Sequence, residues 1–198
     1  MIRLGLTGSI GMGKSTTAAL FAEAGLPVND ADAVVHDLYS GEAVPLVEEA
    51  FPGTTRNGSV DRAELSRRLA AQPADFKRLE AIVHPLVRQR EASFLRGQID
   101  AGKDIVVLDI PLLFESGATD RVDVTVVVSC DPQIQRDRVL ARPGMTEEKF
   151  NLILSRQMPD AEKRARADYV IDTGHGIEDA RGQVENIVAA LRQTDRQG

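Results

Sequence analysis

The sequence has few of the features that mark exported or membrane-bound proteins. It contains one cysteine, Cys130, so no disulfide can form within the chain. No run approaches the roughly 18 apolar residues of a membrane span, and the N-terminus lacks the basic and apolar stretches of a secretory signal. These absences predict a cytoplasmic protein with no membrane partner. Cys130 ends the apolar run VTVVVSC, which favours a small buried side chain over a reactive thiol.

The chain also lacks an excess of positive charge, since 24 lysines and arginines face 30 acidic residues and the formal net charge is −6. An acidic protein is a poor general ligand for nucleic acid, and we predict no nucleic-acid partner. The segment 136–166 is an exception, with eight arginines and lysines against five acidic residues. Such a basic segment is either a solvated helix face or a local clamp for an anion.

Internal repeats and low-complexity tracts are absent, and the length fits one domain. Five short runs have strand character and are continuously apolar rather than alternating. They span residues 2–7, 26–30, 104–110, 122–129 and 168–173. Continuous apolar runs are typical of parallel strands that helices cover on both faces.

Segments with helical periodicity separate these strands. They cover residues 16–24, 74–102, 146–157, 159–166 and 177–191. Pro85 interrupts the second segment, where we expect a kink or the start of a new helix. The alternation of strand and helix predicts an α/β protein with a parallel five-strand sheet.

A glycine-rich stretch, GSIGMGKS, follows the first strand at residues 8–15 and precedes the first helix. It matches G-x-x-x-x-G-K-[ST], in which glycines let backbone amides surround phosphate oxygens and the helix N-terminus attracts the same anion. Lys14 would reach the β- and γ-phosphates of a nucleoside triphosphate, and the Ser15 hydroxyl would ligate Mg²⁺. The residues expected to contact the nucleotide are Gly11, Met12, Gly13, Lys14, Ser15 and Thr16.

The motif alone leaves several classes of nucleotide-binding protein open. A GTPase would need a guanine-reading Asn-Lys-x-Asp and a switch Asp-x-x-Gly, and the sequence has neither. Motor and transporter ATPases are normally larger. A small-molecule kinase is therefore favoured, with a non-enzymatic nucleotide-binding switch as the more distant alternative.

Five strings, in order, extend this reading: LTGSIGMGKST, VNDADAVVH, IVHPLV, VLDIPLLFE and RQMPDAEKRARADYVIDTG. Together they resemble the dephospho-CoA kinase family over roughly residues 2–190. Ser9 and Met12 stand where that family more often has glycine and serine, at variable positions of the motif. The resemblance implies transfer of the γ-phosphate of MgATP to the ribose 3′-hydroxyl of dephospho-CoA. The alternative is another nucleoside, nucleotide or small-molecule kinase of the same fold.

The resemblance also implies a three-layer P-loop NTPase fold with three regions. The core would comprise residues 1–39, 103–135 and 167–198. A helical region over about 40–102 would bind the CoA moiety, and the basic segment 136–166 would be a mobile lid.

Asp32 follows the second strand, at the sheet edge where ligand sites of parallel sheets form. The resemblance gives the matching aspartate the role of general base for the ribose hydroxyl. The other interpretation is that Asp32 caps a helix starting at Ala33. Asp30 is either a partner of Asp32 or a cap.

Arg138 and Arg142 are four residues apart, so one helix face would present both guanidinium groups. The resemblance places the arginine at position 142 over the phosphates, where a planar cation suits the charge of a transferring phosphoryl group. Lys163 and Arg166 match further basic positions.

The remaining candidates come from the strings around His84-Pro85 and Pro111-Leu112. By resemblance they lie on the acceptor side, although a histidine before proline is equally well a structural cap. Asp109 ends an apolar strand and would orient Mg²⁺ through water or cap the next turn. The catalytic set is thus Lys14, Asp32 and Arg142.

Overall fold

The computed structural model describes residues 1–195, which form two compact units. The first, called here the core unit, comprises Met1–Asn29 and the chain from Ala101 onwards. The second, called the helical unit, is Asp30–Asp100. Asp32 therefore belongs to the helical unit.

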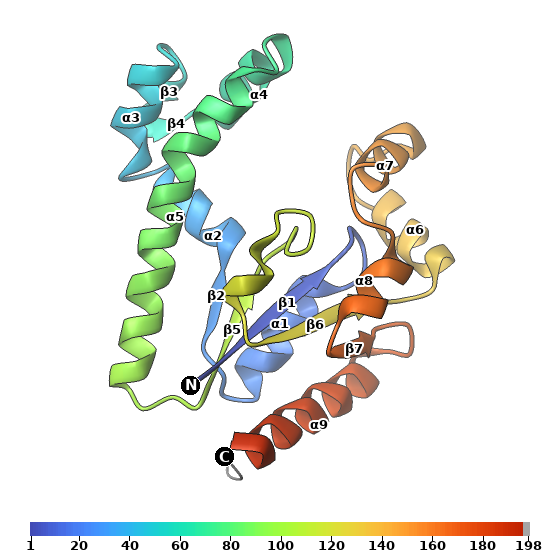
Figure 1. The fold of residues 1–198 in the computed structure, drawn as a ribbon. Coiled ribbons are helices and arrows are strands. Elements are labelled where there is room, and N and C mark those ends of the chain that lie inside the picture. Colours follow the sequence, from blue (N-terminus) through green and yellow to red (C-terminus); the bar gives the residue numbers. More distant parts are fainter. Residues whose placement is uncertain (196–198) are drawn as a thin grey trace. The chain divides into compact units, whose positions relative to one another are not determined.

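A five-stranded sheet forms the centre of the core unit (Figure 1). Its strands are β1 (Ile2–Gly8), β2 (Val28–Asp30), β5 (Ile105–Asp109), β6 (Val124–Ser129) and β7 (Tyr169–Asp172). The order across the sheet is β2-β5-β1-β6-β7, and β1 pairs in parallel with both β5 and β6. β7 continues the parallel pairing on the other side of β6.

All five strand predictions are confirmed within two residues at each end. β5 shows why these runs are continuously apolar, since all five of its residues, Ile105–Asp109, are buried. Side chains alternate between the two faces of a strand, so both faces are shielded from water. Because β1 is parallel to both β5 and β6, the carboxyl ends of these three strands lie at the same edge of the sheet.

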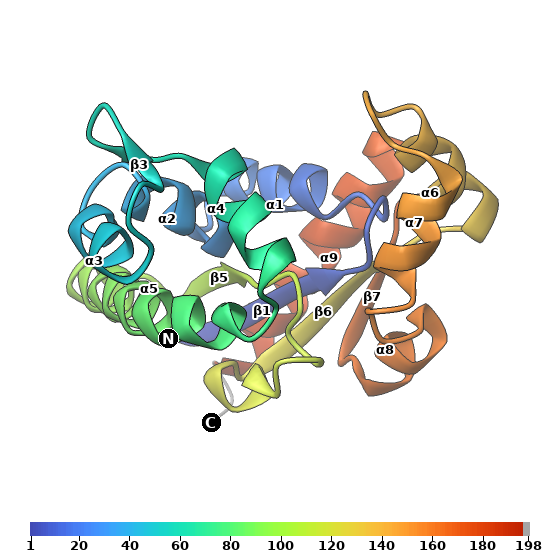
Figure 2. The same ribbon diagram turned by 90° about the horizontal axis from the view of Figure 1, so that it is seen from above.

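The α-helices of the core unit are α1 (Lys14–Glu23), α6 (Pro132–Leu140), α7 (Glu147–Leu154), α8 (Asp160–Arg166) and α9 (Ile177–Asp195). A short 3₁₀ helix, η1, spans Ala118–Arg121. Leu20 and Phe21 of α1 share one apolar cluster with Val184 and Ile187 of α9 and with the buried strand side chains. The two helices therefore pack together on the sheet (Figure 2).

The predicted shared helix face of Arg138 and Arg142 is wrong. α6 ends at Leu140, and Arg142 lies in the turn beyond, where its amide donates to the Val139 carbonyl. The sequence Arg142-Pro143-Gly144 explains the end of the helix, because a proline disfavours the α conformation in the residue before it. α7 and α8 confirm the helices predicted over 146–157 and 159–166, although both are shorter.

The helical unit contains α2 (Ala31–Leu38), α3 (Ala43–Ala50), α4 (Arg62–Ala71) and α5 (Asp75–Asp100), with a two-stranded hairpin of β3 (Thr55–Arg56) and β4 (Ser59–Val60). α5 passes through Pro85, so no new helix begins there. His84 consequently lies inside a helix and is exposed, and its interpretation as a cap is wrong. A separate apolar cluster around Leu38, Val47 and Phe51 stabilises this unit.

Among the described residues, no helix combines the length and the apolar character needed to span a membrane.

Candidate functional site

The loop between β1 and α1 contains several backbone amides that make no hydrogen bond within the described chain. Gly11 and Gly13 have φ angles of 79° and 94°, in the left-handed region that favours glycine. Gly13 is the N-cap residue of α1, before Lys14, and no side-chain hydrogen bond caps this helix. Within the described chain, the N–H groups of Gly11 and Gly13 and of the first three residues of α1 donate to no protein acceptor. Such a group of amides at a helix N-terminus is suited to binding an anion.

The Lys14 side chain points to the same sheet edge, where it meets Asp109 at the end of β5. Its Nζ lies 2.5 Å from Asp109 Oδ1, and the carboxylate side chain is only 2% exposed. A buried charge requires a partner, and each residue supplies one for the other. Lys14 itself is partly exposed, so its ammonium group is accessible to an incoming anion.

Three polar side chains from distant parts of the core unit fix the shape of this loop. Gln135 Nε2 donates to the Ile10 carbonyl at 2.7 Å, and Gln157 Oε1 accepts the Ile10 amide at 3.1 Å. Thr173 Oγ1 donates to the Met12 carbonyl at 2.7 Å. None of these three residues was predicted to have a role. The only available signal was their position at or after the carboxyl ends of predicted strands, or inside the quoted string that contains Gln157.

Met12 anchors the loop from within. Its side chain is 2% exposed, and its sulfur accepts the amide of Cys130, which follows β6. Burial raises the pKa of the Cys130 thiol above its ordinary value, so the thiol stays protonated and unreactive. The expectation of a buried, inert cysteine is confirmed, and the variable position 12 of the motif has a packing role.

Gly11→Ala should destabilise the protein more than Gly25→Ala. Both glycines have a φ near +80°, which costs an alanine about 1–2 kcal/mol. A Cβ at Gly11 would also lie 2.4 Å from Val139 Cγ2 of α6, whereas a Cβ at Gly25 meets nothing within 4 Å. Overpacking of this kind costs about a further 1–3 kcal/mol. Urea unfolding of the two variants measures the difference, and equal losses would contradict close packing of the loop against α6.

Ser15 and Thr16 occupy the first turn of α1 and are exposed. Thr17 is buried instead, and its hydroxyl donates to the Gly13 carbonyl. The Ser15 hydroxyl is thus free to ligate a cation beside a phosphate bound to the loop. The oxygen donors of Ser15 and Asp109 are of the type that suits Mg²⁺, which is usually held by one or two protein oxygens and by substrate phosphates.

The two arginines of the candidate site differ in how they are held. The Arg138 guanidinium donates to Thr173 Oγ1 and to the Thr173 carbonyl, at 2.9 and 2.8 Å. Arg138 is therefore fixed to the residue that also bonds the phosphate-binding loop. Arg142 is exposed, and its side chain makes no hydrogen bond or ion pair with the part of the chain that the structure describes.

In the helical unit, Asp30 is the N-cap of α2, because its carboxylate accepts the amides of Asp32 and Ala33. The alternative in which Asp32 caps this helix is therefore wrong. Asp32 lies in the first turn of α2, is exposed, and pairs with no described residue. Its carboxylate is available to a ligand.

The loop after β5 carries the other acceptor-side candidates. The Pro111 carbonyl accepts the hydroxyl of Thr7, a fully buried residue near the end of β1, at 3.1 Å. Leu112 is 43% exposed, although Leu113 beside it is fully buried. The structure therefore places Pro111 and Leu112 at the same sheet edge as Asp109.

A parallel α/β sheet, a glycine-rich loop between β1 and α1 and a lysine opposite a buried aspartate define a P-loop nucleotide-binding protein. The sequence model for dephospho-CoA kinase matches residues 2–179. A dephospho-CoA kinase from Rhizobium etli is 66% identical over 198 residues, which cover 100% of this chain and 98% of the relative. The chain belongs to the dephospho-CoA kinase family and is an enzyme of the kinase class.

Two solved structures support the fold. A crystal structure from Thermus thermophilus has a TM-score of 0.81 and 36% identity, covering 96% of this chain and 97% of its own. The dephospho-CoA kinase from Campylobacter jejuni has a TM-score of 0.74 at 22% identity, with 98% of each chain covered, and supports the fold.

Proposed function

We propose that this protein transfers the γ-phosphate of ATP to the ribose 3′-hydroxyl of dephospho-CoA, giving coenzyme A and ADP. The observation that carries the proposal is the row of free amides around Lys14, in a chain that matches the family model from residue 2 to residue 179. The acceptor is a small molecule. The net charge of −6 argues against a nucleic-acid partner, and a single buried cysteine suits the reducing cytoplasm.

Binding of the triphosphate would rest on the loop amides and on the Lys14 ammonium, which together offset the charge of the phosphates. Ser15 and Asp109 are the residues that would hold Mg²⁺, and the ion supplies further neutralisation of phosphate charge when bound. Lys14 would then exchange its contact with Asp109 for phosphate oxygens. Catalysis by such a site is positioning and charge stabilisation without a covalent enzyme intermediate.

Asp32 would accept the proton of the ribose 3′-hydroxyl as that oxygen attacks the phosphorus. Its exposure and the absence of a partner among the described residues support this role. We further propose that Arg142, in the lid segment 136–166, closes over the phosphates, and that Arg138, Pro111, Leu112 and His84 contribute to substrate binding. The exposed and unpaired guanidinium of Arg142 supports its part in this proposal.

An assay of ADP release with different acceptors tests the function. With MgATP as donor, dephospho-CoA should be phosphorylated orders of magnitude faster than adenosine or a nucleoside monophosphate. Mass spectrometry of the product would show the added phosphate on the ribose. A preference for adenosine or a nucleotide would replace the proposal by another small-molecule kinase, and ADP release with no acceptor phosphorylated would contradict kinase chemistry.

A further inference from the structure

Two strings far apart in the sequence, PLLFE and RQMPDAEK, contact each other in the core unit through Glu115, Met158 and Lys163. We propose that Gln157, held in place by the buried Glu115–Lys163 ion pair, is a positioning residue that sets the shape of the phosphate-binding loop through the amide of Ile10. The inference rests on the proposed function, because it assigns these residues to the ATP site.

The direct link is the hydrogen bond from the Ile10 amide to Gln157 Oε1, at 3.1 Å. A trans peptide is planar, so its carbonyl points away from its N–H. Fixing the Ile10 N–H therefore also fixes the carbonyl of Ser9, which accepts the Met12 amide at 3.2 Å. Gln157 in this way holds the first turn of the loop closed.

Gln135 acts on the next peptide by the same geometry. Its Nε2 holds the Ile10 carbonyl at 2.7 Å, so the Gly11 N–H points in the opposite direction. The Gly11 N–H is one of the amides that donate to no protein acceptor in the described chain. With Gln157 on one peptide and Gln135 on the other, the direction of a phosphate-binding amide is fixed before any ligand arrives.

The backbone beside Gln157 is fixed in its turn. The amide of Met158 donates to Glu115 Oε1 at 2.9 Å, and Glu115 lies in the loop after β5. The Gln157 amide donates to the carbonyl of Leu154, the last residue of α7. The Gln157 side chain thus extends from a backbone that is tied on both sides.

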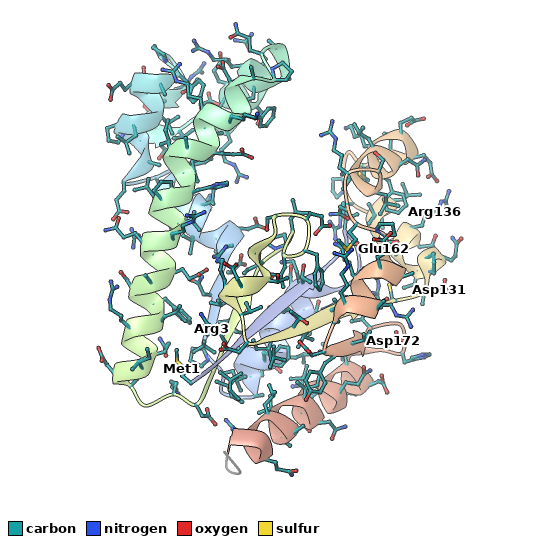
Figure 3. All side chains as sticks on the ribbon, viewed as in Figure 1. Met1, Arg3, Asp131, Arg136, Glu162 and Asp172 are labelled. Atoms are coloured by element: carbon teal, nitrogen blue, oxygen red, sulfur yellow. The ribbon has the colours of Figure 1, made fainter. Side chains whose placement is uncertain are left out.

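Lys163 places the Glu115 carboxylate. The side chain of Lys163 is fully buried on α8, and its Nζ lies 2.8 Å from Glu115 Oε1. Burial pushes the pKa of Glu115 upward, but the contact with Lys163 and the Met158 amide outweigh burial and hold that pKa below its usual value. Glu115 therefore stays ionised and keeps its grip on Met158. Glu162, the exposed neighbour of Lys163 on α8, is labelled in Figure 3.

The first turn of α8 is tied to the sheet edge as well, since Asp160 Oδ2 accepts the Ser129 hydroxyl at the end of β6 at 2.8 Å. Three buried atoms of this cluster make no aligned hydrogen bond within the described chain: Glu115 Oε2, Asp160 Oδ1 and Lys163 Nζ. The Lys163 contact has ion-pair distance without hydrogen-bond alignment. Buried polar groups that are incompletely paired weaken a fold, so stability alone does not account for these residues, which favours a role in positioning.

Gln157→Leu is the direct test, because Gln157 is only half-buried and its loss removes no buried charge. The Kd for ATP, measured by calorimetry on the full chain, should rise about fivefold to tenfold, the value of one hydrogen bond. The KM for dephospho-CoA and kcat at saturating ATP should stay within about twofold of wild type. Gln133→Leu is the matched control, since the Gln133 side chain donates to Asp137 within α6 and its loss should leave the Kd unchanged.

A double-mutant cycle then tests whether Lys163 acts through Gln157. Lys163→Met should also raise the Kd for ATP. The double variant should have a Kd no higher than that of the single variant with the higher Kd. The proposal would be overturned if the two increases in Kd multiplied in the double variant, or if folded Gln157→Leu had an unchanged Kd. If Lys163→Met does not fold, Gln157→Leu decides alone. A wild-type protein that fails to phosphorylate dephospho-CoA would instead contradict the proposed function.

Discussion

Lys14→Ala should abolish measurable phosphoryl transfer, with kcat falling by at least about 10³-fold. Lys14 is the first residue of α1, and its ammonium group lies 2.5 Å from the buried Asp109 carboxylate. Its removal deprives the transferring phosphoryl group of a fixed positive charge. Steady-state rates of ADP release with dephospho-CoA measure the effect. Lys103→Ala, which removes an exposed lysine of the same unit, should leave kcat unchanged.

The ion pair with Asp109 provides an internal control for this experiment. Lys14→Ala leaves the buried Asp109 carboxylate without its lysine, so thermal stability should also fall. Adding Asp109→Asn removes that charge and should recover part of the lost stability without any recovery of activity. Near-normal turnover in folded Lys14→Ala would refute the assignment of the phosphate site.

Asp32→Asn should lower kcat by about 10²–10⁴-fold and leave the KM for ATP nearly unchanged. The amide cannot take up the proton of the ribose hydroxyl, yet it preserves the shape of the side chain. Asp32 does not cap α2, so the helix should keep its stability. Initial rates over a range of ATP and dephospho-CoA concentrations separate kcat from the two KM values.

Two neighbouring aspartates serve as controls for Asp32. Asp37→Asn changes another exposed carboxylate of α2 and should be neutral in every assay. Asp30→Asn should also keep the helix, because asparagine caps as well as aspartate, whereas Asp30→Ala should cost about 1 kcal/mol of stability. A near-normal kcat in Asp32→Asn would rule out its role as general base.

The sheet could be predicted from the sequence because its signal is local. β5 reads as IVVLD, with every residue buried, and no distant contact is needed to recognise such a run. The phosphate-binding loop was predictable for the same reason, since its glycines and Lys14 are consecutive. At Pro85 a kink or a new helix was predicted, and the second alternative is wrong because α5 accommodates the proline within its 26 residues.

The support of the site could not be predicted, because it depends on contacts between residues far apart in the chain. Ile10 and Gln157 are 147 positions apart, and Met12 and Thr173 are 161 apart. The sequence around Gln157 and around Thr173 has no local pattern that predicts a hydrogen bond to the loop. The end of α6 before Arg142 could have been predicted, because the Arg142-Pro143 pair is a local signal for a helix end. The prediction followed the i, i+4 spacing of Arg138 and Arg142 instead.

The dependence of the loop on Thr173 also bears on the order in which the chain is made. A ribosome releases the glycine-rich motif within the first fifteen residues, but the threonine that bonds the Met12 carbonyl emerges only after β7. α9, whose side chains complete the apolar cluster with α1, follows later still. A nascent polypeptide interrupted before residue 173 would therefore carry the phosphate motif without the finished shape that lets it grip a nucleotide.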